Sequence, residues 1–183
     1  MCIRDRCIDN HLLYTIKTRR SIRKYTDEPL PENALRHILL AGMYSPSSRN
    51  RRPWEFILVN DPDMLKKMSG CRVGSAKMLE HAKAAIVVIG NPEVSDVWIE
   101  DCSVVMYGMH LMADYLGVGS CWIQCRLRQA EDGSSTKEYL RHLLHFPEDF
   151  EVEAILSLGM PEQHPQSPDI TEELLPKLHH NKY

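Results

Sequence analysis

The chain has 183 residues, 43% of them hydrophobic and 26% charged, a balance typical of a single globular domain with its own core. Its 22 Lys and Arg against 25 Asp and Glu give a formal charge of -3, which removes the electrostatic basis for general nucleic-acid binding. No apolar run approaches the roughly 20 residues that span a membrane, and the charged N-terminus lacks a secretory apolar stretch, so we expect a cytoplasmic protein.

The N-terminal quarter predicts a leader and two helices. Residues 1–10 show no periodicity, and we expect them to be a disordered or appended leader ahead of one domain over residues 11–183. A short amphipathic helix is predicted to run to Lys17 and to lead into a basic segment. The next helix, with Pro31 at its first position, continues to Met43 and ends before a polar, proline-containing loop.

The middle of the chain alternates between extended and helical patterns. The elements predicted there are a strand over 56–59, a helix over 62–68, a helical piece over 74–81 and a buried strand over 84–89. Residues 96–116 then form the longest periodic segment, with apolar residues that step by three and four. This seam fits a helix packed within its own domain or against a second copy of the chain, and its length favours a homodimer.

The last third predicts a strand within 117–124, a helix opened by the capping box Ser135 to Glu138, and a strand over 152–158. Residues 160–183 contain several prolines and are expected to form an extended tail. The pattern indicates an α+β sandwich with helices on both faces of a small, mainly antiparallel sheet. The sequence has neither a dinucleotide-binding glycine fingerprint nor a nucleotide phosphate loop.

Positive charge is concentrated between Thr18 and Tyr25, where four of eight residues are cationic. The guanidinium forks of Arg19, Arg20 and Arg23 suit phosphate oxygens, and Ser21 adds a hydroxyl. We interpret this basic segment as one wall of a site for a phosphorylated anion. The alternative is a solvated basic turn.

The remaining reactive residue types give weaker signals. The six cysteines make no Cys-x-x-Cys pair and the nine histidines form no ligand set on a helix, so no metal site is expected. No side-chain nucleophile or general base stands out. Cys121 is a candidate redox thiol, but the sequence disfavours this role because no second cysteine stands at Cys-x-x-Cys spacing from it.

Three ordered stretches resemble the FMN-dependent nitroreductase family: residues 19–23 (Arg-Arg-Ser-Ile-Arg), residues 46–56 around Pro53-Trp54, and residues 117–123 (Gly-Val-Gly-Ser-Cys-Trp-Ile). Gly159-Met160-Pro161 is similar to the family's Gly-x-Pro element. The resemblance implies an obligate homodimer with a long central helix at the interface and two FMN sites, each built from both subunits.

The resemblance also assigns expected roles to residues. Arg19 and Ser21 would hold the FMN phosphate with Arg20 alongside, and Arg23 would stabilise negative charge at the pyrimidine edge of the reduced ring. The other expected ring contacts are Pro46, Ser47, Ser48 and Asn50 of the other subunit, and backbone N–H groups of Trp122, Ile123 and Gln124. Two positions depart from the family pattern. Arg52 stands where many relatives have glutamine before the Pro-Trp pair. The basic residues that relatives often have after the Gly-x-Pro are reduced to His164, with Lys177 farther along the chain.

The implied activity is a two-step oxidoreduction, in which NAD(P)H gives hydride to FMN N5 and a small acceptor such as a nitroaromatic or quinone then takes the electrons. Dehalogenation or enone reduction is an enzymatic alternative, and NADH is not distinguished from NADPH. Two other classes stay open. One is a module that stores, senses or dismantles flavin, and the other is a dimeric interaction protein whose arginines contact an acidic partner.

Overall fold

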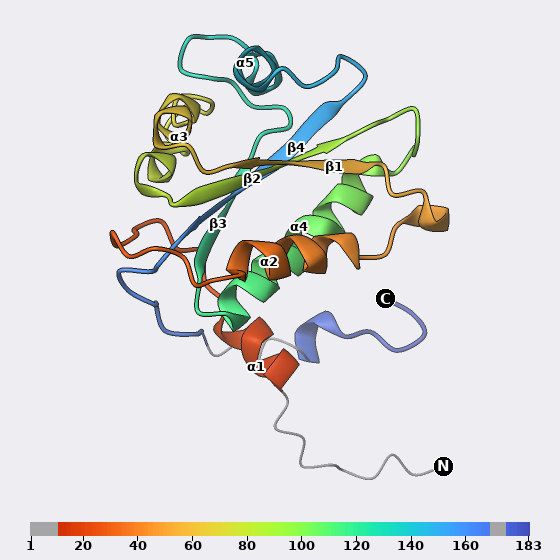
Figure 1. Ribbon diagram of the computed structural model, residues 1–183. Helices are drawn as coiled ribbons and strands as arrows, with labels where there is room; N and C mark the ends of the chain where they lie inside the picture. The colour runs from red at the N-terminus through yellow and green to blue at the C-terminus, as the bar shows by residue number, and fades with distance from the viewer. Residues whose placement is uncertain (1–10, 169–174) are drawn as a thin grey trace.

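The computed structural model describes residues 11–168 and 175–183, so the predicted leader over 1–10 lies outside the described residues. Its centre is a four-stranded sheet of β1 (Trp54–Val59), β2 (Ala84–Gly90), β3 (Gly119–Gln124) and β4 (Glu151–Gly159). The strand order is β1-β2-β4-β3 and every neighbouring pair is antiparallel (Figure 1). The α+β sandwich is confirmed, with a sheet that is antiparallel throughout its named strands.

Helices cover both faces of this sheet (Figure 1). One face carries α2 (Ala34–Met43) and α4 (Trp98–Tyr115), with α1 (His11–Thr18) beside α4. The other face carries α3 (Pro62–Met68), η2 (Lys77–His81) and α5 (Thr136–Leu144). Two short 3-10 turns, η1 (Ser48–Asn50) and η4 (Leu175–Lys177), lie outside these layers.

The two faces of the sheet build two separate cores. Because side chains alternate along a strand, Leu156 of β4 packs beneath α2 and α4, whereas its neighbour Ile155 packs beneath α3 and α5. Ile38 and Met109 complete the first core, and both are fully buried. The seven residues of β2 are all buried, as expected for a central strand.

Local signals explain where several helices begin. Asp61 precedes α3 and accepts a hydrogen bond from the Met64 N–H at 2.7 Å, with Pro62 at the first helical position. The capping box predicted at Ser135 and Glu138 is confirmed at the start of α5.

Two boundaries predicted from the sequence are wrong. Pro31 does not open a helix, because Asn33 adopts a left-handed backbone with φ 62° and α2 begins only at Ala34. The helical piece predicted over 74–81 reduces to η2, because Gly74 has φ 66° and interrupts the helix.

The apolar seam of α4 packs within its own chain: Trp98, Cys102, Val105 and Met109 are buried against the sheet and α2. A second apolar stripe on α4 faces outward and consists of Val104, Tyr107, Leu111 and Tyr115. The apolar side chains of α1 are exposed too, with Leu12 at 64%. A cavity of about 360 Å³ with mainly apolar walls lies between α1 and α4. We call this stripe, with Leu12, Leu13 and Ile16 of α1, the apolar face.

Among the described residues, no helix combines the length and the hydropathy that crossing a bilayer requires.

Candidate functional site

The basic segment lies along the outer edge of β3. Ser21 forms a parallel bridge with Ser120, and the Ile22 N–H donates to the Ser120 carbonyl at 2.9 Å. On its other side, the segment pairs with the chain that leaves β4, where the Thr26 N–H donates to the Met160 carbonyl at 2.9 Å. The cationic side chains are therefore attached to the sheet through their own backbone.

Gly159 permits this close approach. A Cβ placed on Gly159 would lie 2.6 Å from Tyr25 Cγ, so only glycine lets the Tyr25 ring cross β4 at this point. The Tyr25 hydroxyl donates to the Ile22 carbonyl at 2.9 Å and lies 2.7 Å from Ser157 Oγ. Burial raises the Tyr25 pKa well above its usual range, so the hydroxyl stays protonated and the ring stays fixed.

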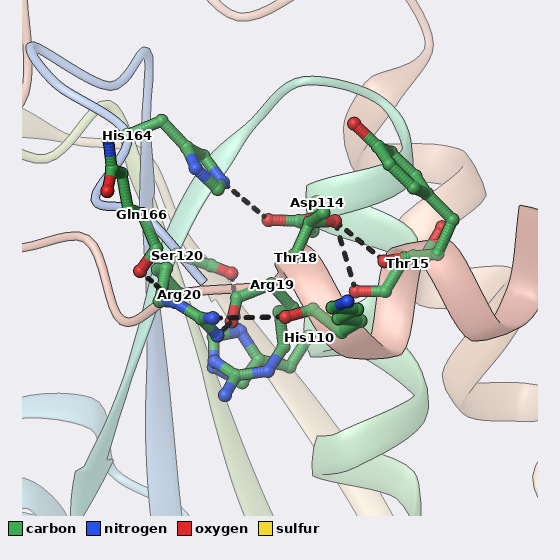
Figure 2. A network of polar contacts seen from close by, with 11 residues as sticks. Thr15, Thr18, Arg19, Arg20, His110, Asp114, Ser120, His164 and Gln166 are labelled. Atoms are coloured by element: carbon green, nitrogen blue, oxygen red, sulfur yellow. Dashed lines mark hydrogen bonds and ion pairs between the residues drawn. The ribbon is translucent and has the colours of Figure 1, made fainter. Parts of the chain in front are cut away.

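Arg19 points toward α4, where it meets a buried histidine (Figure 2). Arg19 Nη1 lies 2.7 Å from His110 Nε2, and His110 Nδ1 lies 2.6 Å from Ser120 Oγ. His110 is only 4% exposed. Two hydrogen bonds in series thus connect three segments that are far apart in the sequence: the basic segment, α4 and β3.

The hydrogen-bond pattern fixes the protonation of His110. A guanidinium can only donate, so Nε2 must accept from Arg19, and the proton must lie on Nδ1, which donates to Ser120 Oγ. Burial, aided by the Arg19 charge, lowers the His110 pKa to about 3. His110 is therefore a neutral acceptor throughout the physiological range.

Arg20 is already occupied by protein carbonyls. It donates through Nε to the Gln166 carbonyl at 3.1 Å, through Nη2 to the Lys17 carbonyl at 3.0 Å, and through Nη1 to the Arg19 carbonyl. These bonds attach the start of the C-terminal tail to the basic segment, as Figure 2 shows.

His164 lies on the same stretch of tail, and its Nε2 is 3.1 Å from Asp114 Oδ1 on α4 (Figure 2). The structure thus places the predicted His164 near Arg19 and Arg20, with one ring nitrogen engaged by a carboxylate.

Arg23 lines a separate pocket of about 470 Å³, which neither Arg19 nor His110 lines. Cys121, Trp122 and Met78 are among the residues that line this pocket. Its four cationic side chains are Arg23, Lys24, Arg72 and Lys77. Lys77 also pairs with Glu131 at 3.1 Å. Arg72 and Lys77 were missed in the sequence because they lie far from the basic segment along the chain, Lys77 within the predicted helical piece and Arg72 just before it.

The three predicted residues of β3 differ in where their backbone points. The Ser120 carbonyl points to the outer edge of β3, where it accepts from the Ile22 N–H. Backbone groups of residues two apart point to the same edge of a strand, so the N–H groups of Trp122 and Gln124 also point outward. Ile123 is directed toward β4 by the same alternation and its side chain is buried. The Trp122 indole N–H donates to Gln124 Oε1 at 2.9 Å, which fixes the ring beside the pocket.

The thiol beside this pocket is unsuited to redox chemistry. Burial is the main cause that raises the pKa of Cys121, although Arg23 and Arg19 oppose it. The thiol is therefore protonated near neutral pH and is a weak nucleophile.

The other predicted loop, 46–52, contacts α4 near its start, whereas Arg19 contacts His110 nearer the end of this helix. Buried Asp101 near the start of α4 accepts from the Ser48 N–H at 2.7 Å and from Ser95 Oγ at 2.9 Å. Nine residues, or about 14 Å of helix, separate Asp101 from His110. Within one chain, the structure therefore does not bring Pro46, Ser47, Ser48 and Asn50 to the basic segment.

This loop is also conformationally strained. Arg49, Asn50 and Arg52 all have positive φ angles, between 49° and 56°. The Arg52 N–H donates to Ser47 Oγ at 3.0 Å, and Arg52 Nε donates to Asn50 Oδ1 at 3.0 Å. Arg52, which departs from the family pattern, thus holds the Asn50 amide in place.

Known proteins resemble this chain in sequence and in fold. The profile of the nitroreductase family matches residues 16–95. A protein from Archaeoglobus fulgidus, with the provisional name NADH dehydrogenase/NAD(P)H nitroreductase, is 38% identical over 93% of this chain and 98% of its own. The solved structure of an FMN-dependent nitroreductase from Clostridium difficile has a TM-score of 0.89 and 39% identity, covering 93% of this chain and 99% of that one.

A nitroreductase from Desulfovibrio desulfuricans, solved in complex with FMN, is more distant. It has a TM-score of 0.73 and 27% identity, covering 91% of this chain and 96% of that one.

Proposed function

The chain belongs to the nitroreductase family of oxidoreductases, and from this we propose that it binds FMN and uses NAD(P)H to reduce small acceptors such as nitroaromatics or quinones. The observation that carries the proposal is the basic segment on the edge of β3, which offers a phosphate site on one side of the strand and a cationic pocket on the other.

The donor set fits a phosphate. Arg19 donates one N–H to the neutral His110, and among the described residues no carboxylate forms an ion pair with it. The positive charge of Arg19 and its other N–H donors therefore remain available to an anion. Ser21 is half-buried beside it. Arg20 serves the site indirectly in this proposal, by holding the backbone of residues 17–19 and the tail together.

The pocket fits the ring. Its volume of about 470 Å³ is within the range of small-molecule sites, and its cations favour a ligand that gains negative charge. Arg23, Arg72 and Lys77 would face the pyrimidine edge. The N–H groups of Trp122 and Gln124 would donate to the polar atoms around N5.

Bound FMN would supply hydride acceptance and donation at N5, and the residues of this chain bind, orient and polarise it. No described side chain is needed as a nucleophile or general base. The protonated side chains of Cys121 and Tyr25 have structural roles in this proposal.

We further propose that the functional unit is a homodimer formed through the apolar face. Monomeric proteins seldom leave a continuous patch of this kind exposed. If two α4 helices pack antiparallel about a twofold axis, the Ser48 loop near the start of one helix comes beside Arg19 near the end of the partner's helix. This arrangement would complete each site with Pro46, Ser47, Ser48 and Asn50 of the other subunit.

A visible absorption spectrum of the reconstituted protein, taken before and after anaerobic NADH or NADPH, tests the function. We expect a bound-flavin band that one nucleotide bleaches and that a nitroaromatic or quinone restores. A bound flavin that no nucleotide bleaches would instead indicate a flavin-handling module. Failure to take up any flavin would leave the basic segment as a protein-contact surface.

The role of Arg23 is tested by the reduction potential of bound FMN. Replacing Arg23 by alanine removes a cation near the ring, and a loss of about 1.4 kcal/mol of charge stabilisation lowers a two-electron potential by about 30 mV. Arg23→Lys keeps the charge and should retain most of the potential. If spectroelectrochemistry gives the same potential for Arg23→Ala and the wild type, Arg23 does not act on the ring.

A further inference from the structure

The buried His110 is not explained by packing alone, since an apolar residue would fill the same space in the core beneath α4. We propose that His110 is a positioning residue of the phosphate site, which holds the Arg19 guanidinium by one hydrogen bond so that the rest of the fork faces the anion. The inference rests on the proposed function, because it takes the FMN phosphate as the anion at Arg19.

The geometry supports this role from two sides of the ring. His110 Nε2 accepts from Arg19 at 2.7 Å, and Nδ1 is anchored on Ser120 Oγ at 2.6 Å. Ser120 also accepts the Ile22 N–H through its carbonyl, so one residue of β3 holds both the backbone of the basic segment and the imidazole. The guanidinium is thereby fixed relative to Ser21 and the edge of β3.

A neutral acceptor is the chemically suitable partner for this task. A carboxylate at the same place would hold Arg19 equally well, but its negative charge would oppose an incoming phosphate. The imidazole leaves the positive charge of Arg19 uncompensated. Asp114 on α4, the carboxylate labelled in this cluster, is engaged by His164 (Figure 2).

The groups that surround the imidazole keep it in this state. Arg19 from the basic segment faces one nitrogen and Ser120 from β3 faces the other. Burial and the adjacent cation both disfavour a charged ring. His110 therefore accepts from Arg19 over the whole pH range in which the protein would act.

The test compares FMN with riboflavin, which lacks the phosphate, by quenching of flavin fluorescence on the apoprotein. His110→Leu removes the acceptor and should weaken FMN by roughly 10-fold or more, the cost typical of a hydrogen bond to a charged group, while riboflavin changes less than about 3-fold. His110→Gln offers its amide oxygen to Arg19 and should restore FMN affinity to within about 5-fold of the wild type. In the double variant Arg19→Ala/His110→Leu, FMN should bind no more weakly than to Arg19→Ala alone.

The outcomes separate this inference from the function on which it rests. If Arg19→Ala weakens FMN selectively but His110→Leu weakens both flavins equally, or if the two losses add, the positioning role is overturned and the phosphate site stands. If Arg19→Ala does not distinguish FMN from riboflavin, the phosphate assignment itself fails and the inference fails with it. Should His110→Leu not fold, Ser120→Ala replaces it, and the absence of an FMN-selective loss there also overturns the role.

Discussion

Replacing Leu111 by glutamate is expected to convert the protein to a monomer and to abolish flavin binding. Leu111 is near the middle of the outward stripe of α4, between Tyr107 and Tyr115. A buried, unpaired carboxylate costs several kcal/mol, and a twofold interface would contain two of them close together. The substitution leaves the core of the single chain intact, because the buried seam lies on the other side of the helix.

The matched control introduces the same substitution elsewhere. Leu58 on the edge strand β1 is 40% exposed and lies outside the apolar face, so Leu58→Glu should remain dimeric and keep its flavin. Sedimentation velocity gives the mass, and the flavin-to-protein absorbance ratio gives the occupancy. A Leu111→Glu monomer that still holds FMN would show that one chain builds the whole site. A Leu111→Glu dimer would place the interface elsewhere.

The loss of flavin in a monomer would follow from the separation of the two loops. Asp101 holds the Ser48 loop near the start of α4, and His110 holds Arg19 near its end. A single helix keeps these sites apart, and only a second, antiparallel copy can superpose them. The length of α4 would then be a functional feature, because it sets the distance across the dimer between the two halves of each site.

Much of the fold could be predicted because its signals are local. The capping box at Ser135, the Asp61-Pro62 start of α3 and the apolar run of β2 each lie within a few residues of the element they define. The strand order could not be predicted. β4 comes last in the sequence and yet lies between β2 and β3, and this depends on long-range pairing that has no local signature.

The residues of the candidate site also fall into those with a local sequence signal and those that only the fold brings together. The basic segment was found because four cations in eight residues stand out in an acidic chain. Arg72 and Lys77 reach the same pocket only because the chain around Gly74 turns instead of continuing a helix. His110 was missed because a lone histidine next to Met109 in a helical pattern resembles a packing residue. Its position on the buried side of α4 was the available signal.

Gly159→Ala is expected to destabilise the protein by about 2–3 kcal/mol and to weaken FMN binding at the same time. The new methyl group would lie 2.6 Å from Tyr25 Cγ and 2.7 Å from Cδ1, in a close-packed interior where overpacking typically costs about 1–3 kcal/mol. The ring cannot move aside, because its hydroxyl is held by Ile22 and Ser157.

Relief of this clash requires the basic segment to lift from β3, which would displace Arg19 and Arg23 together. Thermal unfolding should show a decrease in Tm of roughly 4–12 °C for a domain of this size. Gly133→Ala is the control, because its Cβ would meet nothing within 4 Å and only its φ of 88° opposes the change, at a cost of about 1 kcal/mol. In a Tyr25→Ala background, Gly159→Ala should cost less stability, because the ring that the new methyl group would meet is gone. The losses of stability of the two single variants will therefore not add in the double variant if the ring is the obstacle. Additive losses would mean that Gly159 matters for a reason other than the approach of Tyr25, and the link between this glycine and the phosphate site would be lost.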